Sequence, residues 1–201
     1  MKIILNLYEN FLDITSDLDQ LNKLNPNQDD EFGGTNDQVY DEDDYILSPY
    51  KNPEFFEGLC NMCEHYQIPY NKNGFLQEDL NQITLIDSDD NCRSYFKNVI
   101  SLDELQYFYN LEKIYSWSFS ECRKLKSIIF PENLKIIQHS AFGGCNSLKE
   151  LKFPENIQFI SDHAFIYCDS LEKIIIPKIF KNDIEDIFYG IYLTNVNITY
   201  I

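Results

Sequence analysis

The sequence predicts an α+β repeat solenoid: a short stack of coils with a parallel sheet, a small helical cap before the stack and a helix-strand cap after it. The first observation is that Cys122, Cys145 and Cys168 follow one another at intervals of 23 residues. The second is that apolar residues and prolines keep this interval on both sides of the cysteines. The registered columns are Phe119, Phe142 and Phe165; Leu125, Leu148 and Leu171; Ile128, Leu151 and Ile174; Phe130, Phe153 and Ile176; Pro131, Pro154 and Pro177; Leu111, Leu134 and Ile157; and Ile114, Ile137 and Ile160. Such a period is typical of solenoids, in which one coil buries its apolar side only against the next.

Within each coil, the segment Leu-x-x-apolar-x-apolar-Pro predicts a short strand. Successive side chains of a strand point to opposite faces, so the two apolar residues that lie two positions apart share the inner face. Proline ends the strand because it has no N–H to donate to a continuing ladder. We therefore expect each coil to add one strand to a parallel sheet, while Ile137 and Phe142, in the rest of the coil, point into the same core.

Residues 111–177 repeat the pattern L-x-x-I-x-I-P … I-x-x-x-A-F-x-x-C in register. This pattern resembles the BspA-type (Treponema pallidum-type) leucine-rich repeat. The stretches 52–60, 71–84 and 100–114 look like the short helical lead-in of such repeats in gut Bacteroidetes proteins and their bacteriophages, so the resemblance covers roughly residues 52–177. It implies a non-catalytic adhesion or protein-interaction module, and it implies a mode of binding rather than a particular target.

Two segments are expected before the helical cap. Residues 1–25 place apolar residues at alternating steps of four and three, which predicts an amphipathic helical segment that packs on this chain or on a partner. Residues 26–51 are predicted to be an acidic linker, because 28–45 carry eight acidic residues and no basic one. A tether for a basic partner is the alternative for this linker.

The remaining boundaries follow from helix signals and from the end of the repeat. Residues 52–98 are expected to form the helical N-terminal cap: Asn52 followed by Pro53 is a helix start, and a second short helix is expected over 77–84. The leucine-rich repeats are expected over residues 99–177. Residues 178–201 are expected to form the C-terminal cap, with an Asn-capped helical turn ending at Gly190 and a strand in which Val196, Ile198 and Tyr200 alternate.

Composition limits the classes of partner and location. The chain has 201 residues, is 44% hydrophobic and has a net charge of −17, so it can bury a core but lacks the clustered cations that nucleic acid requires. Residues 1–96 carry 5 basic and 20 acidic residues. No signal peptide and no membrane span are predicted. We therefore expect a cytoplasmic or virion-assembled protein with reduced cysteines.

One group of thiols has the residue types of a zinc site. Cys60, Cys63 and His65, with Cys92 later in the chain, could be its ligands. A single CxxC without a second pair is weak evidence, and both cysteines fall on the apolar face of the expected helix. Core packing is the preferred interpretation, so no metal and no cofactor are assigned.

Other polar groups also receive ordinary explanations. The stretches 71–74 and 87–91 resemble part of a calcium loop but lack its required ligands and glycine. His139 and His163 are expected at solvent-facing turns of neighbouring coils. No nucleophile elbow, phosphate loop or HExxH motif occurs, so no catalytic residue is assigned.

The preferred binding surface is the outward row of the repeated strands, which faces away from the core. Its residues are Lys126, Ser127, Ile129, Lys149, Glu150, Lys152, Glu172, Lys173 and Ile175. Ile129 and Ile175 are informative because an apolar spot ringed by lysines suggests contact. The alternative is a solvated sheet face without a partner.

We expect a non-catalytic module that binds a protein partner or a cell-surface receptor through this row. A bacteriophage virion or bacterial surface component is the expected setting, with virion proteins contacted through residues 1–25. A structural subunit that assembles only with copies of itself is the first alternative. An enzyme is the second, disfavoured alternative.

Overall fold

The computed structural model describes residues 45–48, 51–68, 70–89, 91 and 93–201. The chain divides into two units, 1–39 and 40–201, and the fold below belongs to the second. The predicted helical segment 1–25 lies outside the described residues, as does most of the predicted linker 26–51. The described end of that linker is packed rather than exposed, because Tyr45 and Leu47 are buried and Leu47 pairs with Phe75 in an isolated antiparallel bridge.

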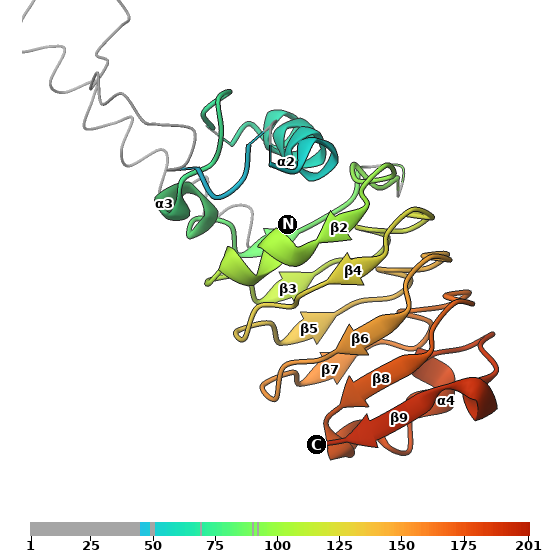
Figure 1. Cartoon of the computed structure of the whole chain (residues 1–201). Coiled ribbons are helices and arrows are strands. Elements are labelled where there is room, and N and C mark those ends of the chain that lie inside the picture. Colours follow the sequence, from blue (N-terminus) through green and yellow to red (C-terminus); the bar gives the residue numbers. More distant parts are fainter. Residues whose placement is uncertain (1–44, 49–50, 69, 90, 92) are drawn as a thin grey trace, which may run out of the picture. The chain divides into compact units, whose positions relative to one another are not determined.

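Short parallel strands run in two rows along the stack (Figure 1). The first row is one four-stranded sheet, made of β1 (Leu85–Ile86), β3 (Lys113–Ile114), β5 (Ile136–Ile137) and β7 (Phe159–Ile160). The second row is divided into a two-stranded sheet, made of β2 (Ser101–Leu102) and β4 (Ser127–Ile128), and a three-stranded sheet, made of β6 (Glu150–Lys152), β8 (Lys173–Ile176) and β9 (Asn197–Tyr200).

The register of these strands confirms the 23-residue repeat and corrects one expectation. Ile114 pairs with Ile137, and Ile137 pairs with Ile160; Leu151 pairs with Ile174. The prediction of one strand per coil is wrong, because a coil adds one strand to each of the two rows. Ile114, Ile137 and Ile160 are buried as predicted. Each is the second residue of a strand of the first row, and the first residue of that strand faces outward.

A ladder of five phenylalanine rings runs through the core. Their centroids are 4.8 Å apart for Phe96–Phe119, 5.1 Å for Phe119–Phe142, 5.1 Å for Phe142–Phe165 and 5.3 Å for Phe165–Phe188. The repeat pattern predicts only the three central rings. Phe96 and Phe188 keep the same 23-residue interval, so the ladder extends by one ring at each end. All five side chains are buried.

The turns of the coils also repeat, through two positions with left-handed backbone. At the first position, φ is 60° at Trp117, 51° at Ser140 and 59° at His163. At the second position, φ is 62° at Glu121, 76° at Gly144, 59° at Tyr167 and 84° at Gly190. Members of each set are 23 residues apart. Stacking therefore imposes the left-handed conformation, since most of these residues are not glycine and do not favour it.

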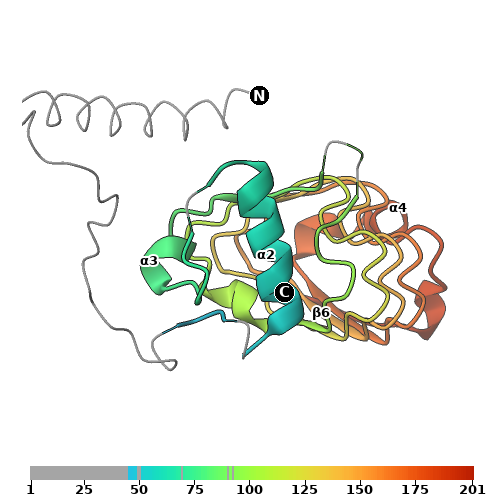
Figure 2. The same cartoon turned by 90° about the horizontal axis from the view of Figure 1, so that it is seen from above.

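Helix α2 (Pro53–His65) begins where the sequence predicts. The Asn52 side chain accepts a hydrogen bond from the Phe55 N–H at 3.4 Å, and Pro53 is the first helical residue. Seen from above, α2 lies across the end of the coils (Figure 2). The Phe55 ring lies 5.6 Å from Phe96 and 5.8 Å from Phe108, so the helix buries its apolar face against the first coil.

The second predicted helix is shorter than expected. Helix α3 spans Gln77–Leu80, with the Asp79 carboxylate accepting from the Leu76 N–H at 2.9 Å. The chain turns after α3 and enters β1, which pairs with β3. Ile83 and Thr84 are β-branched, which favours the extended chain over a continued helix. Residues 52–98 thus contain a strand as well as helices.

The C-terminal part contains the expected helix and strand. After the 3-10 helix η3 (Lys178–Phe180), helix α4 spans Ile184–Ile187, and η4 (Leu193–Asn195) precedes β9. Asn182 does not cap α4. The N-cap position is occupied by Asp183, whose side chain makes no capping hydrogen bond. Strand β9 pairs with β8. Its Ile198 and Tyr200 are half-buried while Asn197 and Thr199 are exposed, which confirms the predicted alternation.

Candidate functional site

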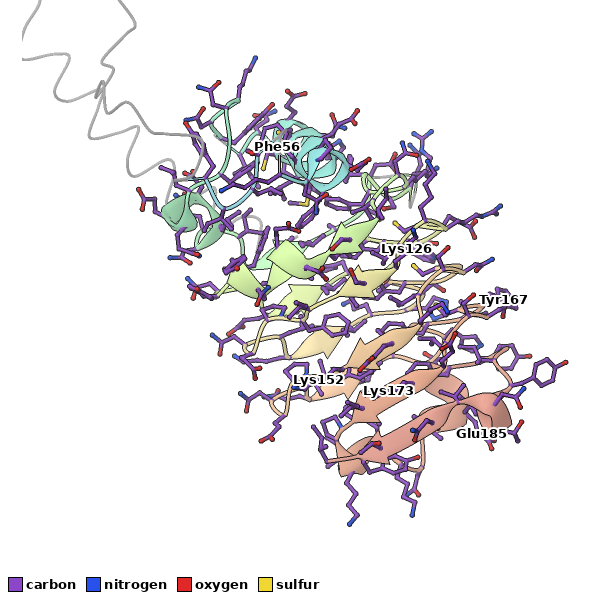
Figure 3. All side chains as sticks on the ribbon, viewed as in Figure 1. Phe56, Lys126, Lys152, Tyr167, Lys173 and Glu185 are labelled. Carbon is purple, nitrogen blue, oxygen red and sulfur yellow. The ribbon has the colours of Figure 1, made fainter. Side chains whose placement is uncertain are left out.

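The nine residues predicted to bind lie along β4, β6 and β8 and form one surface, which we call the β4–β8 face. Lys126, Ile129, Lys149, Glu150, Lys152 and Glu172 are exposed, and Ser127, Lys173 and Ile175 are half-buried. Lys126, Lys152 and Lys173 are labelled on this face in Figure 3. Their strand neighbours Ile128, Leu151 and Ile174 are buried, so the predicted division into inner and outer positions is confirmed. The structure does not test whether this face binds a partner.

Two reciprocal ion pairs join β6 to β8 on this face. Lys149 Nζ lies 2.7 Å from Glu172 Oε1, and Lys173 Nζ lies 2.6 Å from Glu150 Oε1. The pairs arise because each partner is 23 residues from the other, at equivalent positions of adjacent coils. These side chains are exposed, so each pair stabilises the fold by no more than about 1 kcal/mol. The pairs neutralise four of the charges that line the face.

The row of strands is interrupted between β4 and β6. Among the described strands, β4 pairs with β2, and β6 pairs with β8, but no ladder joins β4 to β6. A groove of about 420 Å³, here called the β4–β6 groove, lies at this interruption. The groove is lined by Asp103, Lys126, Ser127, Ile128, Ile129, Phe130, Glu132, Glu150, Lys152, Phe153 and Pro154. The groove therefore includes five of the nine predicted residues.

The groove combines an apolar centre with free cations. Ile129 is 44% exposed, and the buried Phe130 and Phe153 lie beside it in the lining. Lys126 and Lys152 have no carboxylate within ion-pair distance among the residues that the structure describes. Their ammonium groups are thus available to an acidic partner, in contrast to the paired lysines of β6 and β8.

Asp103 is a groove residue that the sequence analysis missed. It begins the 3-10 helix η2 (Asp103–Tyr107). The Ser127 hydroxyl donates to Asp103 Oδ2 at 3.1 Å, and the Asp103 N–H donates to Ser101 Oγ at 3.0 Å. The signal in the sequence is spacing: the paired residues Ser101 and Ser127 are 26 residues apart instead of 23, so the earlier coil has room for η2 beside the groove.

The repeat cysteines form a hydrogen-bonded column in the core. Each thiol donates to the carbonyl of a phenylalanine in the preceding coil: Cys122 to Phe96 at 3.1 Å, Cys145 to Phe119 at 3.3 Å and Cys168 to Phe142 at 3.2 Å. All three are free thiols and are buried. Burial raises the pKa of Cys145 well above its ordinary value. The sequence predicts that these cysteines fill space in the core. The structure shows that each thiol also donates a hydrogen bond to the backbone.

The thiols of helix α2 follow the core interpretation. Cys63 is buried, Cys60 is half-buried and His65 is exposed, while Cys92 lies outside the described residues. Burial raises the pKa of Cys60 to about 11 and that of Cys63 to about 12. Both groups are therefore neutral thiols at pH 7.

In the stretch 87–91, which resembles part of a calcium loop, the Asp89 carboxylate is bound by neighbouring residues of the same turn. Asp89 Oδ1 accepts from the N–H groups of Asn91 and Arg93, and Asp89 Oδ2 lies 2.9 Å from Arg93 Nε. The hydrogen bond from the Arg93 N–H is the main cause that lowers the pKa of Asp89. This carboxylate organises its own turn.

The repeated parallel strands, the phenylalanine ladder and the cysteine column define a leucine-rich-repeat protein. The family model of the BspA type leucine rich repeat region matches residues 70–200 in six copies. The chain belongs to this BspA-type family. The match reaches beyond the expected repeat segment 99–177 on both sides, in agreement with the ladder positions of Phe96 and Phe188.

Comparison with solved structures found similarity to a leucine rich cell surface protein from Faecalibacterium prausnitzii. The two sequences are 25% identical, and the TM-score is 0.35. The match covers 59% of this chain and 32% of the other, so the chain spans about a third of that protein. Comparison with curated proteins found no match.

Within the part of the chain that the structure describes, every helix is too short or too polar to cross a bilayer.

Proposed function

We propose that the chain is a non-catalytic protein-interaction or adhesion module that binds a protein partner or a cell-surface receptor through the β4–β8 face. Membership of a repeat family whose members are generally non-catalytic supports the class of function. The observation that carries the location is the β4–β6 groove, where the exposed Ile129 lies with two unpaired lysines.

This arrangement has the anatomy of an interface. Interfaces join a desolvated apolar centre to a polar rim, and a few central residues supply most of the binding energy. Ile129 is such a centre, and Lys126 and Lys152 belong to the rim. A partner that inserts an apolar side chain next to a carboxylate would satisfy both. The β6–β8 ion pairs hold the neighbouring side chains in place, which lowers the entropy lost on binding.

Replacement of Ile129 by Glu tests this face. The full chain and its Ile129→Glu variant, immobilised on beads, are incubated with lysates of candidate host cells, and recovered proteins are quantified. We expect at least one protein to be recovered ten-fold less by the variant and to bind the purified wild-type chain directly. The matched control is Ile179→Glu, because Ile179 is 67% exposed and lies in η3, away from the groove.

Equal recovery by the wild-type chain and the Ile129→Glu variant, with the fold intact by circular dichroism, contradicts the groove as the contact. If Ile129→Glu does reduce recovery, the replacements Lys126→Glu and Lys152→Glu separate the effect of charge from that of shape. For an acidic partner, reversing the charge of these lysines should weaken capture more than Ile129→Ala does.

A structural subunit that assembles with its own copies is a second candidate, supported by strand β9. This strand pairs with β8 and, among the described strands, with nothing on its other side. An unpaired edge can add a strand of another chain. Sedimentation velocity over a hundred-fold concentration range tests this candidate, because a concentration-independent monomer contradicts it.

The sequence resemblance supports a bacterial surface or bacteriophage virion location, with residues 1–25 as the attachment to virion proteins. Helix α2 and strand β9 lie at the two ends of the stack, which supports their role as caps, since an uncovered coil would leave core in water. Removal of residues 1–39 tests the attachment role, because it should abolish incorporation into particles while the repeats remain folded.

A further inference from the structure

The turns that follow β5 and β7 bring three potential metal ligands together. His139 lies two residues after β5, and Asp162 and His163 lie two and three residues after β7. Because Ile137 pairs with Ile160, His139 and Asp162 occupy equivalent positions of adjacent coils. Equivalent residues of paired strands are about 4.8 Å apart. The sequence predicts His139 and His163 only as solvent-facing turn residues and assigns no role to Asp162.

The distances are short enough for a shared ion. His163 Nδ1 lies 3.4 Å from Asp162 Oδ2, and His139 Nδ1 lies 3.9 Å from Asp162 Oδ1. One ligand atom from each of the three residues lies within 4.8 Å of the others. Nitrogen and oxygen ligands lie about 2.0–2.2 Å from a zinc ion, so tetrahedral ligand atoms are roughly 3.4 Å apart. Side-chain movements of about 1 Å would bring the ligand atoms to the separation of a tetrahedral site.

A second observation concerns His163 itself. Its Nδ1 is buried and has no hydrogen bond among the described residues, although it lies 3.4 Å from Asp162 Oδ2. A buried polar atom without a partner is rare and requires an explanation. Metal coordination is one interaction that an imidazole nitrogen beside a carboxylate can make.

The surroundings orient the carboxylate. The Ser161 hydroxyl donates to Asp162 Oδ1 at 2.9 Å. This hydrogen bond, followed by the proximity of His163 and His139, lowers the pKa of Asp162, so the carboxylate is ionised at neutral pH. The Tyr189 ring lies 4.8 Å from the His163 ring and limits its motion. Such outer contacts are typical of residues that hold metal ligands in position.

We propose that His139, Asp162 and His163 form a site for a divalent transition-metal ion such as Zn²⁺. Two imidazoles and one carboxylate suit Zn²⁺, Cu²⁺ or Ni²⁺, whereas Mg²⁺ and Ca²⁺ prefer oxygen ligands. The side chains of His139 and Asp162 are 46% and 63% exposed, so the remaining coordination position opens to water. A bound ion would clamp the turns of two adjacent coils.

The chain has three histidines, so ring proton NMR of the full chain supplies an internal control. Zn²⁺ is titrated in the presence of a reductant that does not bind metal. We expect the ring signals of His139 and His163 to shift together, and those of His65, which lies in α2, to remain in place over the same range. Mg²⁺ should leave all three unchanged.

Variants identify the ligands. Asp162→Asn and His139→Ala are expected to weaken Zn²⁺ binding at least ten-fold in calorimetry, and Zn²⁺ should raise the melting temperature of the wild-type chain more than that of either variant. His65→Ala and Asp169→Asn are the matched controls and should bind as the wild type does. A shift of all three histidines over one concentration range, or unchanged affinity in Asp162→Asn, overturns the proposal.

Discussion

At the scale of single residues, the repeat positions carry more chemistry than packing alone. The cysteine column is an example, since the thiol of each coil donates to a carbonyl of the coil before it. The same carbonyl at Phe119 also accepts from the Cys122 N–H at 3.4 Å. A small, soft side chain fits the space, and its donor links coils along the stack. This explains why a cysteine, rather than another small apolar residue, serves at this position.

Cys145→Ala should therefore destabilise the fold. The substitution removes a buried sulfur and the donor to Phe119, and we expect the free energy of unfolding to fall by about 1–2 kcal/mol. Denaturant unfolding measures the change. Ser147→Ala is the control, because the Ser147 hydroxyl also donates to a carbonyl, that of Arg123 at 2.6 Å, but at an exposed site. A loss at Ser147 as large as that at Cys145 would contradict the role of burial.

The raised pKa of Cys63 predicts a loss of stability in alkaline solution. The unfolded thiol ionises near 9.0, whereas the folded one retains its proton until about pH 12. The contribution of the protonated Cys63 thiol to the free energy of unfolding is fully present below pH 9. It is lost between pH 9 and 12, at up to about 1.4 kcal/mol per pH unit. Urea unfolding of the wild type and of Cys63→Ala checks this prediction. The variant should lose stability less steeply, and parallel curves would refute the assignment.

At the scale of elements, a coil consists of two strands joined by turns with fixed left-handed positions. Glu121, Gly144, Tyr167 and Gly190 share one such position although their side chains differ. The conformation belongs to the coil, and a non-glycine residue accepts it at a cost of roughly 1 kcal/mol. The residue type at this position therefore affects only the local backbone strain. The strands depend instead on the apolar residues that recur at buried positions.

Opposite changes at this turn position should differ in their effects on stability. In Gly144→Ala, the new Cβ would lie 2.7 Å from Glu121 Oε1 and the backbone at φ 76° would be strained, so we expect a loss of about 1 kcal/mol. Glu121→Gly relieves strain at φ 62° and loses only an exposed contact with Arg123, so stability should be unchanged or slightly higher. Thermal unfolding distinguishes the two, and equal destabilisation would contradict the argument.

At the scale of the whole molecule, stability is propagated from coil to coil. Each of the three inner rings of the phenylalanine ladder contacts the ring before and the ring after it. Helix α2 contacts the first ring through Phe55. A stack of this kind behaves as a sum of coil stabilities and nearest-neighbour contacts. Damage at the centre should therefore affect both directions, and damage at an end should remain local.

Phe142→Ala and Phe188→Ala test this propagation. Phe142 packs between Phe119 and Phe165, so its loss should cost about 3–5 kcal/mol and increase hydrogen exchange along the stack. Loss of Phe188, which ends the ladder, should increase exchange mainly in residues 184–200 and leave β2 and β4 protected. Equal and global effects of the two variants would contradict the nearest-neighbour account.

The sequence by itself determined the period, the buried columns, the start of helix α2 and the inner and outer sides of the second row of strands, because these depend on which residues recur at constant spacing. Tertiary structure alone decided which strands and side chains of adjacent coils contact one another. The second row is broken between β4 and β6, and His139 meets Asp162 and His163, because hydrogen-bonding register and turn conformation place side chains of different coils together. Spacing along one chain predicts which residues are equivalent; distances between neighbouring coils decide which of them can act together.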